Sequence, residues 1–221
     1  MLYRIFTLLA LVVVIHAFLF NRTPAVAAET PNDPIEQLRP YVDEIVEILT
    51  NERFQGDEKC MERRQKIMAL AHERFDFSEM SKRVLGSQWR QLSPQEKQEF
   101  TDLFTTLLEH AYIGKIEDYT NQRVEFRDQR IRNDRAEVKT VIIDRDVVIP
   151  VSYIMILKDR HWLVYDVVVE NVSLVRNYME QFREILRKDS YSSLLAQLKD
   201  KVDRLEQETK ACPVEPELES S

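Results

Sequence analysis

Apolar side chains in the first half of the chain recur every three or four positions, which is the spacing of one helix face. This pattern predicts a helix over residues 33–52, with Asp33 as its N-cap. A second helical pattern covers residues 57–74. A short third helix is expected to begin at Ser78 and to end or bend at Gly86.

The clearest helix signal is Ser93-Pro94-Gln95-Glu96, which combines an N-cap, a first-turn proline and a capping-box glutamate. We expect the helix that follows to reach about Tyr119. Its apolar stripe is long enough that one whole side of the helix must be hidden from water. Further along, Ser173 and Ser190 are expected to cap two more helices.

From about Gln122 the period changes from helical to extended. Four strands are predicted, at residues 123–131, 135–144, 147–158 and 161–170. The turns between them are so short that neighbouring strands must be antiparallel. The last two strands are apolar on both faces, which indicates that helices cover both sides there. The predicted fold class is α+β: a helical N-terminal half, a four-stranded antiparallel sheet covered by helices, and two C-terminal helices.

Residues 1–28 have the pattern of a secretory signal peptide, with a short basic start, an apolar run and small residues before Glu29. We expect cleavage near Ala27 or Ala28. The alternative is an uncleaved anchor, but a membrane span needs about 20 residues and the small-residue site favours cleavage. Residues 29–209 are expected to form a single domain, and the acidic, proline-broken segment 210–221 a disordered tail.

The chain is 44% hydrophobic and 31% charged, which is typical of a globular protein. Without residues 1–28 it has 29 basic and 38 acidic residues, a net charge of −9. Such a surface repels nucleic acid and gives no general attraction to anionic lipid head groups. Contact with a membrane would therefore depend on shape, on local patches or on a protein partner.

Most catalytic and cofactor motifs are missing from the sequence. The three glycines are too far apart to form a phosphate-binding loop, and the chain has no Gly-x-Ser-x-Gly motif. The histidines after residue 28 lie on separate predicted elements, so no metal site is expected. Cys60 and Cys212 are 152 positions apart. An oxidising compartment would allow a bridge between them, which we expect to be an optional tether.

Asp166 is the strongest candidate for a catalytic group. If strand residues alternate regularly, it shares a face with Trp162, Val164 and Val168. A carboxylate in such an apolar setting needs a partner or a shifted pKa, as a general base would have. We favour a structural acid instead, because the sequence places no histidine, lysine or metal ligand beside it.

Periodicity alone therefore leads to an exported α+β domain without evident catalytic equipment. It identifies the faces that avoid water. It does not tell whether the space between those faces is filled by side chains or left open for a ligand.

The order of several short strings resembles the MlaC family of periplasmic phospholipid-binding proteins, also known as toluene-tolerance proteins. The strings extend from about Ile35 to Leu205 and are, in order, Phe75-Asp76-Phe77, Val84-Leu85-Gly86, Trp89, Leu92-Ser93-Pro94, Ile149-Pro150-Val151, Trp162-Leu163-Val164-Tyr165-Asp166-Val167, Val172-Ser173-Leu174-Val175 and Asn177-Tyr178. Two positions depart from the family. Asn171 stands where glycine is common, and Met179 stands where arginine is frequent, so no contact of that arginine is carried over.

The resemblance implies a carrier that holds phospholipid acyl chains in an apolar pocket between sheet and helices. In that family the carrier moves lipid between an outer-membrane lipoprotein–porin complex and the MCE-ring protein of an inner-membrane ABC transporter, and so maintains outer-membrane lipid asymmetry. We therefore expect a monomer in the periplasm that uses no cofactor and binds no nucleic acid. The candidate pocket residues are Val84, Leu85, Trp89, Phe100, Phe104, Leu107, Leu108, Tyr112, Val151, Tyr153, Met155, Trp162 and Val164.

Two other readings remain open at this point. One is an enzyme or small-ligand module with Asp166 as general base in an apolar pocket. The other is an exported scaffold with a solid core.

Overall fold

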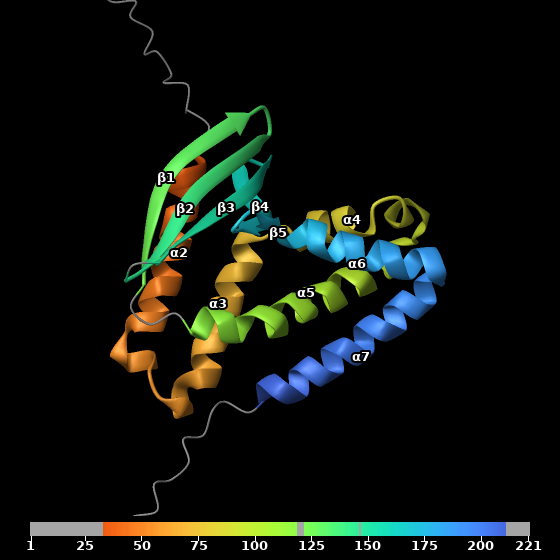
Figure 1. The fold of residues 1–221 in the computed structure, drawn as a ribbon, viewed down its shortest axis with the longest axis horizontal. Coiled ribbons are helices and arrows are strands. Elements are labelled where there is room, and N and C mark those ends of the chain that lie inside the picture. Colours follow the sequence, from red (N-terminus) through yellow and green to blue (C-terminus); the bar gives the residue numbers. More distant parts are fainter. Residues whose placement is uncertain (1–32, 119–121, 146, 211–221) are drawn as a thin grey trace, which may run out of the picture. The chain divides into compact units, whose positions relative to one another are not determined.

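Helices and strands follow one another in the order that the sequence predicts (Figure 1). The computed structural model describes residues 33–118, 122–145 and 147–210. The expected signal segment and residues 211–221 lie outside these ranges. The first helices are α2 (Pro34–Thr50), α3 (Cys60–Arg74), α4 (Phe77–Leu85) and α5 (Pro94–Glu117), with 3₁₀ turns at Glu52–Phe54, Asp57–Lys59 and Gln88–Gln91. They are followed by β1 (Arg123–Arg132), β2 (Arg135–Asp144), β3 (Val147–Lys158), β4 (His161–Val169), β5 (Val172–Ser173), α6 (Leu174–Lys188) and α7 (Tyr191–Lys210).

Side-chain caps start the helices where the sequence predicts them, with one exception. The hydroxyl of Ser93 accepts a hydrogen bond from the backbone N–H of Glu96, whose carboxylate accepts one from Ser93 in return. The exception is Ser78, which does not cap α4. Asp76 caps it instead, by accepting a hydrogen bond of 2.9 Å from the N–H of Glu79. The other predicted caps, each of which accepts a backbone hydrogen bond, are Asp33, Ser173 and Ser190.

The strands of the sheet lie in the order β1-β2-β3-β4-β5, and each strand is antiparallel to its neighbours. Four of these strands are the predicted ones, and β5 is an addition of two residues. It pairs with the end of β4 across the turn Glu170-Asn171, where both residues have positive φ, 50° and 69°. This conformation favours glycine and is tolerated by asparagine, so Asn171 suits the second position of the turn.

A β-bulge corrects the predicted position of Asp166. The register of β3 against β4 shifts between Ile154 and Met155, so that Met155 pairs with Val164 but Ile154 pairs with Asp166. Asp166 therefore lies on the opposite face from Val164, not on the same one. The simple two-residue alternation fails here because the bulge inserts an extra residue into β4.

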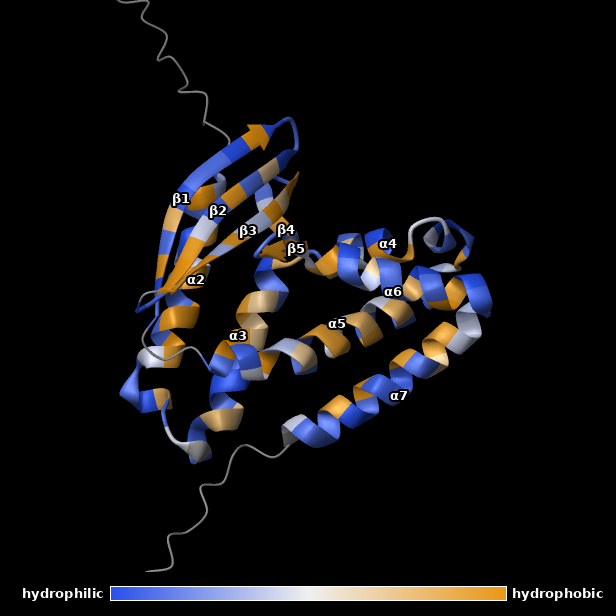
Figure 2. Cartoon of the chain, in the orientation of Figure 1, coloured by the Kyte–Doolittle hydropathy of each residue, from blue (hydrophilic) through white to orange (hydrophobic). Residues whose placement is uncertain are grey.

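Three apolar clusters form the core. The first joins α2 to one face of the sheet, and includes Leu38, Val42, Met155, Trp162 and Val164. The second lies among α4, α5, α6 and α7, and includes Phe100, Phe104, Tyr178 and Phe182. The third joins the end of α2 to α3 and the end of α5. Figure 2 shows the corresponding hydrophobic residues on α5 and on the central strands. Because α4 and α6 also contact β4, this strand has helices on both faces, as expected.

Cys60 begins α3, is fully buried and is disulfide-bonded. Cys212, the partner considered for it from the sequence, lies outside the described residues. None of the helices that the structure describes is both long and apolar enough to span a bilayer.

Candidate functional site

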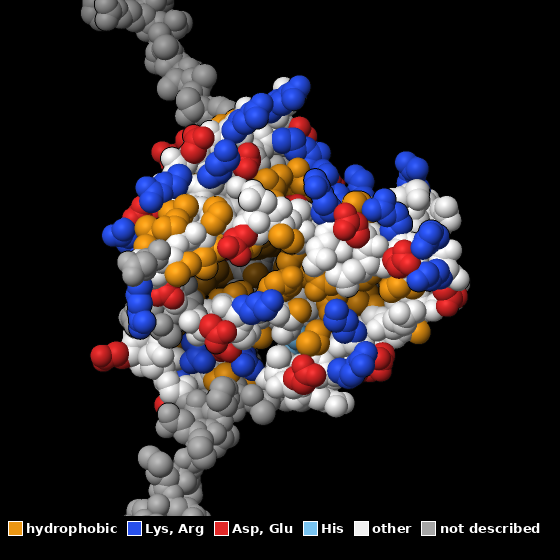
Figure 3. All heavy atoms as spheres, viewed as in Figure 1, with side chains coloured by type: hydrophobic (Ala, Val, Ile, Leu, Met, Phe, Trp, Pro, Cys, Tyr) orange, Lys and Arg blue, Asp and Glu red, His pale blue; other side chains and the backbone are white. Residues whose placement is uncertain are grey.

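An apolar cavity of about 480 Å³ lies where the three clusters meet. Its walls are α2, α3, the start of α4, the second half of α5, all five strands and the first turn of α6. The space-filling view shows a hollow between the sheet and the helices whose visible lining is hydrophobic (Figure 3). The clusters thus surround this space without closing it.

Few polar groups line the cavity among the described residues. Those with a charged or amide side chain are Arg74, Glu109, Lys115 and Asn177, and three tyrosines contribute hydroxyls. Glu109 is half-buried and lies 2.6 Å from the imidazole of His72, so its carboxylate is already partnered. The remaining walls are almost entirely hydrocarbon, a surface suited to alkyl chains.

Exposed valines mark the opening of the cavity. Val169 is 41% exposed and Val172 is 61% exposed, although both line the same space as the buried residues of α2 and α3. Lys115 and Asn177 are also exposed lining residues. An apolar rim that remains in contact with water is expected where an apolar ligand enters.

Four of the thirteen candidate pocket residues line the cavity: Leu108, Tyr112, Val151 and Tyr153. They come from the second half of α5 and from β3, which face each other across it. The other nine pack beside the cavity instead of lining it. Those in the helical cluster are Val84, Leu85, Trp89, Phe100, Phe104 and Leu107, and those between α2 and the sheet are Met155, Trp162 and Val164. Contact with a ligand stays a prediction for the four that line the cavity.

Sequence reasoning missed the contribution of α2, of α3 and of the start of α4. The missed lining side chains include Tyr41, Ile45, Met68, Ala71, Phe75 and Phe77, all of them only half-buried. The available signal was the breadth of the apolar surface of α2. Tyr41 and Ile45 extend the stripe of Leu38 and Val42 beyond what one contact with the sheet requires.

The hydroxyls of Tyr112 and Tyr153 bring no charge into the cavity at physiological pH. Burial raises the pKa of Tyr153 to about 12, although a hydrogen bond with Thr140 acts in the opposite direction. Burial also raises the pKa of Tyr112, and its hydrogen bond with Tyr178 acts against this rise. Both phenols therefore remain neutral and leave the cavity apolar.

No constellation for catalysis is built around this space within the described ranges. They contain no group of three residues able to hold a metal ion. Asp166 does not line the cavity, because its carboxylate accepts hydrogen bonds from the Ser173 hydroxyl and the Val175 backbone at the start of α6.

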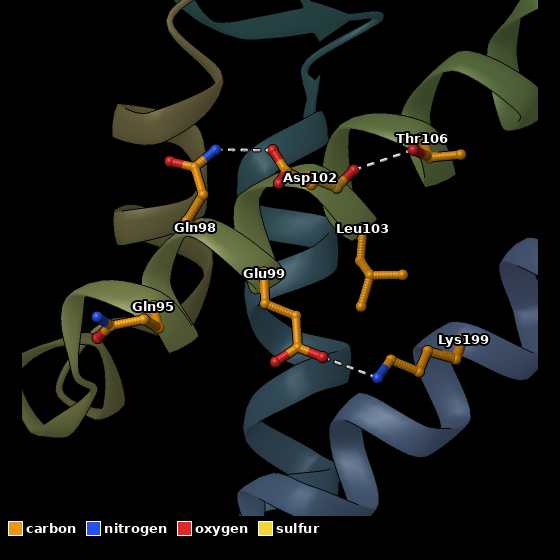
Figure 4. A pocket seen from close by; sticks show the side chains of 7 residues that line it. All are labelled: Gln95, Gln98, Glu99, Asp102, Leu103, Thr106 and Lys199. Atoms are coloured by element: carbon orange, nitrogen blue, oxygen red, sulfur yellow. Dashed lines mark hydrogen bonds and ion pairs between the residues drawn. The ribbon is translucent and has the colours of Figure 1, made fainter.

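A second depression lies between α5 and α7 and differs in character (Figure 4). The side chains around Leu103 are polar or charged, and Lys199 forms an ion pair of 2.8 Å with Glu99. It is a groove open to solvent, without an enclosed apolar volume. We therefore assign the candidate site to the cavity between sheet and helices.

Comparison with known proteins agrees with this geometry. The family model described as MlaC protein matches residues 39–200. The intermembrane phospholipid transport system binding protein MlaC of Haemophilus influenzae is 25% identical over 122 residues, which are 52% of this chain and 57% of that protein. The alignment thus spans little more than half of the relative.

The fold also matches a solved structure. A phospholipid-binding protein from Ralstonia solanacearum, determined in complex with a phospholipid, superimposes with a TM-score of 0.69. The match covers 78% of this chain and 98% of that one, at 21% sequence identity. At this identity the match shows a shared fold.

Proposed function

The chain belongs to the MlaC family, and we propose that it is a periplasmic carrier that holds a phospholipid by its acyl chains. The observation that carries this proposal is the hydrocarbon-lined cavity with an exposed valine rim. The choice of ligand is supported by the relative, a phospholipid transport protein, and by the solved structure, which is a complex with a phospholipid.

The energetics favour such a carrier. Two acyl chains carry about 30 methylenes, each worth about 0.8 kcal/mol when it leaves water, so free lipid in an aqueous compartment is strongly disfavoured. Transfer from a bilayer into an apolar cavity changes the surroundings of the chains very little. Exchange with a membrane can therefore be nearly balanced, and any direction must come from the proteins on which the carrier docks.

The partners proposed for this exchange are an outer-membrane lipoprotein–porin complex and the MCE ring of an inner-membrane ABC transporter. The resemblance to the family supports the choice of these two partners. We further propose that the carrier acts as a monomer, without a cofactor and without chemical conversion of the lipid. The use of Asp166 in a helix cap, outside the cavity, supports the last point.

Transfer between two populations of vesicles tests the proposal. Donor vesicles would carry a fluorescent phospholipid at a self-quenching density, and acceptor vesicles none. The protein should accelerate dequenching in proportion to its concentration. Val151→Trp, which places a large ring in the cavity wall, should abolish most of this acceleration. No acceleration by the wild type, or equal acceleration by a folded Val151→Trp protein, would contradict the carrier function.

A further inference from the structure

Arg74 is a buried guanidinium in the wall of the apolar cavity. It lies at the end of α3, is only 8% exposed and lines the cavity together with Tyr41 of α2. Its carbon Cζ is 3.6 Å from the centroid of the Tyr41 ring. Nη1 donates a hydrogen bond of 3.2 Å to the carbonyl oxygen of Trp162 at the start of β4.

These contacts leave the charge of Arg74 uncompensated. A guanidinium has five N–H donors and stays protonated, but the bond to Trp162 is the only hydrogen bond of this side chain within the described residues. Nε has no partner there, and no carboxylate of the described chain lies within 4 Å. A buried cation in this state is unfavourable unless an anion meets it.

Three arginines that are less deeply buried than Arg74 have such an anion. Arg63 and Arg64 both lie against the carboxylate of Glu117, at 3.0 Å and 2.8 Å. Arg83 lies 2.8 Å from Glu79. Arg74 differs from them because its free donors border a cavity, where a ligand can supply the missing negative charge.

The arginine lies far from the opening of the cavity. Its backbone acceptor, Trp162, precedes the rim residue Val169 by seven positions on β4. Because the bulge in β4 takes up one of these positions, about six strand steps of about 3.3 Å remain, which span about 20 Å. The wall between them includes apolar residues such as Val167 and Tyr153. A ligand that reaches both ends must be long and apolar, with a small anionic group at its inner end.

We propose that the cavity also binds a long-chain fatty acid, with its carboxylate on Arg74 and its alkyl chain extending towards Val169 and Val172. A planar carboxylate can accept two parallel hydrogen bonds from a guanidinium. A phospholipid phosphate cannot reach this position without burying its polar head group. This ligand is additional to the phospholipid of the proposed function and uses the same cavity.

Binding of oleate and of methyl oleate to delipidated protein tests the proposal, because the ester keeps the chain but loses the charge. The wild type should prefer oleate. Arg74→Met should reduce oleate affinity about 10- to 100-fold, as expected for hydrogen bonds to a charged group, and so remove the preference. Arg74→Lys should retain part of it. Lys199→Met, which removes an exposed cation on α7, is the control for net charge.

The ratio of the two affinities in one sample does not depend on the fraction of folded protein. Equal binding of acid and ester by the wild type would overturn the proposal, and so would an unchanged ratio in Arg74→Met. If Arg74→Met lowers phospholipid loading as much as oleate binding, the arginine serves a phosphate and the carboxylate assignment is wrong. Failure of phospholipid transfer with a retained oleate preference would count against the carrier function alone.

A second measurement uses the wild type and oleate labelled with ¹³C at its carboxyl group. The pKa of this carboxyl group should be lower in the bound oleate than in the free monomer.

Discussion

The carboxylate of Asp166 accepts a hydrogen bond of 2.9 Å from the backbone N–H of Val175. This bond joins β4 to the first turn of α6, where the helix has unpaired N–H groups. The other carboxylate oxygen accepts a bond from the hydroxyl of Ser173, which itself caps the helix by accepting from Arg176. Asp166 thus fixes the start of α6 and, with it, one side of the cavity opening.

Replacement of Asp166 by alanine should therefore lower stability without removing the ligand. Loss of a charged hydrogen-bond acceptor at this buried site should cost about 1.5 to 3 kcal/mol, measured by urea unfolding. The purified protein should still contain lipid. Unchanged stability together with loss of a catalysed reaction would instead support Asp166 as a general base.

Leu107 and Leu108 are adjacent on α5 but face different surroundings, which gives a matched pair of variants. Leu108→Trp should displace ligand from the cavity wall and lower the phospholipid bound per protein, with little loss of stability. Leu107 is fully buried in the helical cluster, so Leu107→Trp should destabilise by about 1 to 3 kcal/mol. Phosphorus content and melting temperature separate the two effects. Equal behaviour of the two variants would mean that the cavity is not the lipid site.

Glu117 should contribute to stability more than other acids on the surface. It lies between Arg63 and Arg64 and joins the end of α5 to α3, with only 12% of its side chain exposed. Glu117→Gln leaves two guanidinium groups without a charge partner and should cost about 3 kcal/mol.

Glu184→Gln is the control for this variant. Glu184 is an exposed acid that also contacts two cations, Arg187 and Lys188. Because these ion pairs are exposed to solvent, Glu184→Gln should leave the free energy of unfolding almost unchanged. Chemical denaturation gives the loss of stability in each variant. Similar losses in the two variants would contradict the importance of the ion pairs of Glu117 with Arg63 and Arg64.

Stability should decrease between pH 10 and pH 12, in part because of Tyr153. Its pKa is raised from 10.0 to about 12 in the folded protein, mainly by burial. Above pH 10 the unfolded state releases this proton first, so the folded state loses stability as the pH rises through that window. Tyr153→Phe should make the decrease shallower. An identical pH profile in the two proteins would argue against a buried phenol.

Local signals made most of the fold predictable. The capping box of Ser93 and the apolar stripe behind it specify α5, and two-residue turns specify the antiparallel sheet. Each of these depends on residues that are close in the sequence. The cap of α4 by Asp76 was missed because Ser78 was an equally suitable side chain. The strand β5 was missed because its two residues are too few to show an alternation of apolar and polar side chains.

The site was only partly predictable, because a cavity depends on distant contacts. Leu107 and Leu108 have the same chemistry and lie on the same predicted stripe, yet only Leu108 reaches the open space. The predicted face of Asp166 was wrong because a bulge in β4 shifts the register of this strand. No local sequence pattern revealed the bulge. Arg74 gave no sequence signal, since its burial requires α2, α3 and β4 together.

Native mass spectrometry of the protein purified without added lipid tests the central claim most directly. The account predicts a main species heavier than the polypeptide by the mass of a phospholipid, and a shift to the lipid-free mass in Leu108→Trp. A wild-type protein that is entirely lipid-free, and that stays so after incubation with phospholipid vesicles, would contradict it.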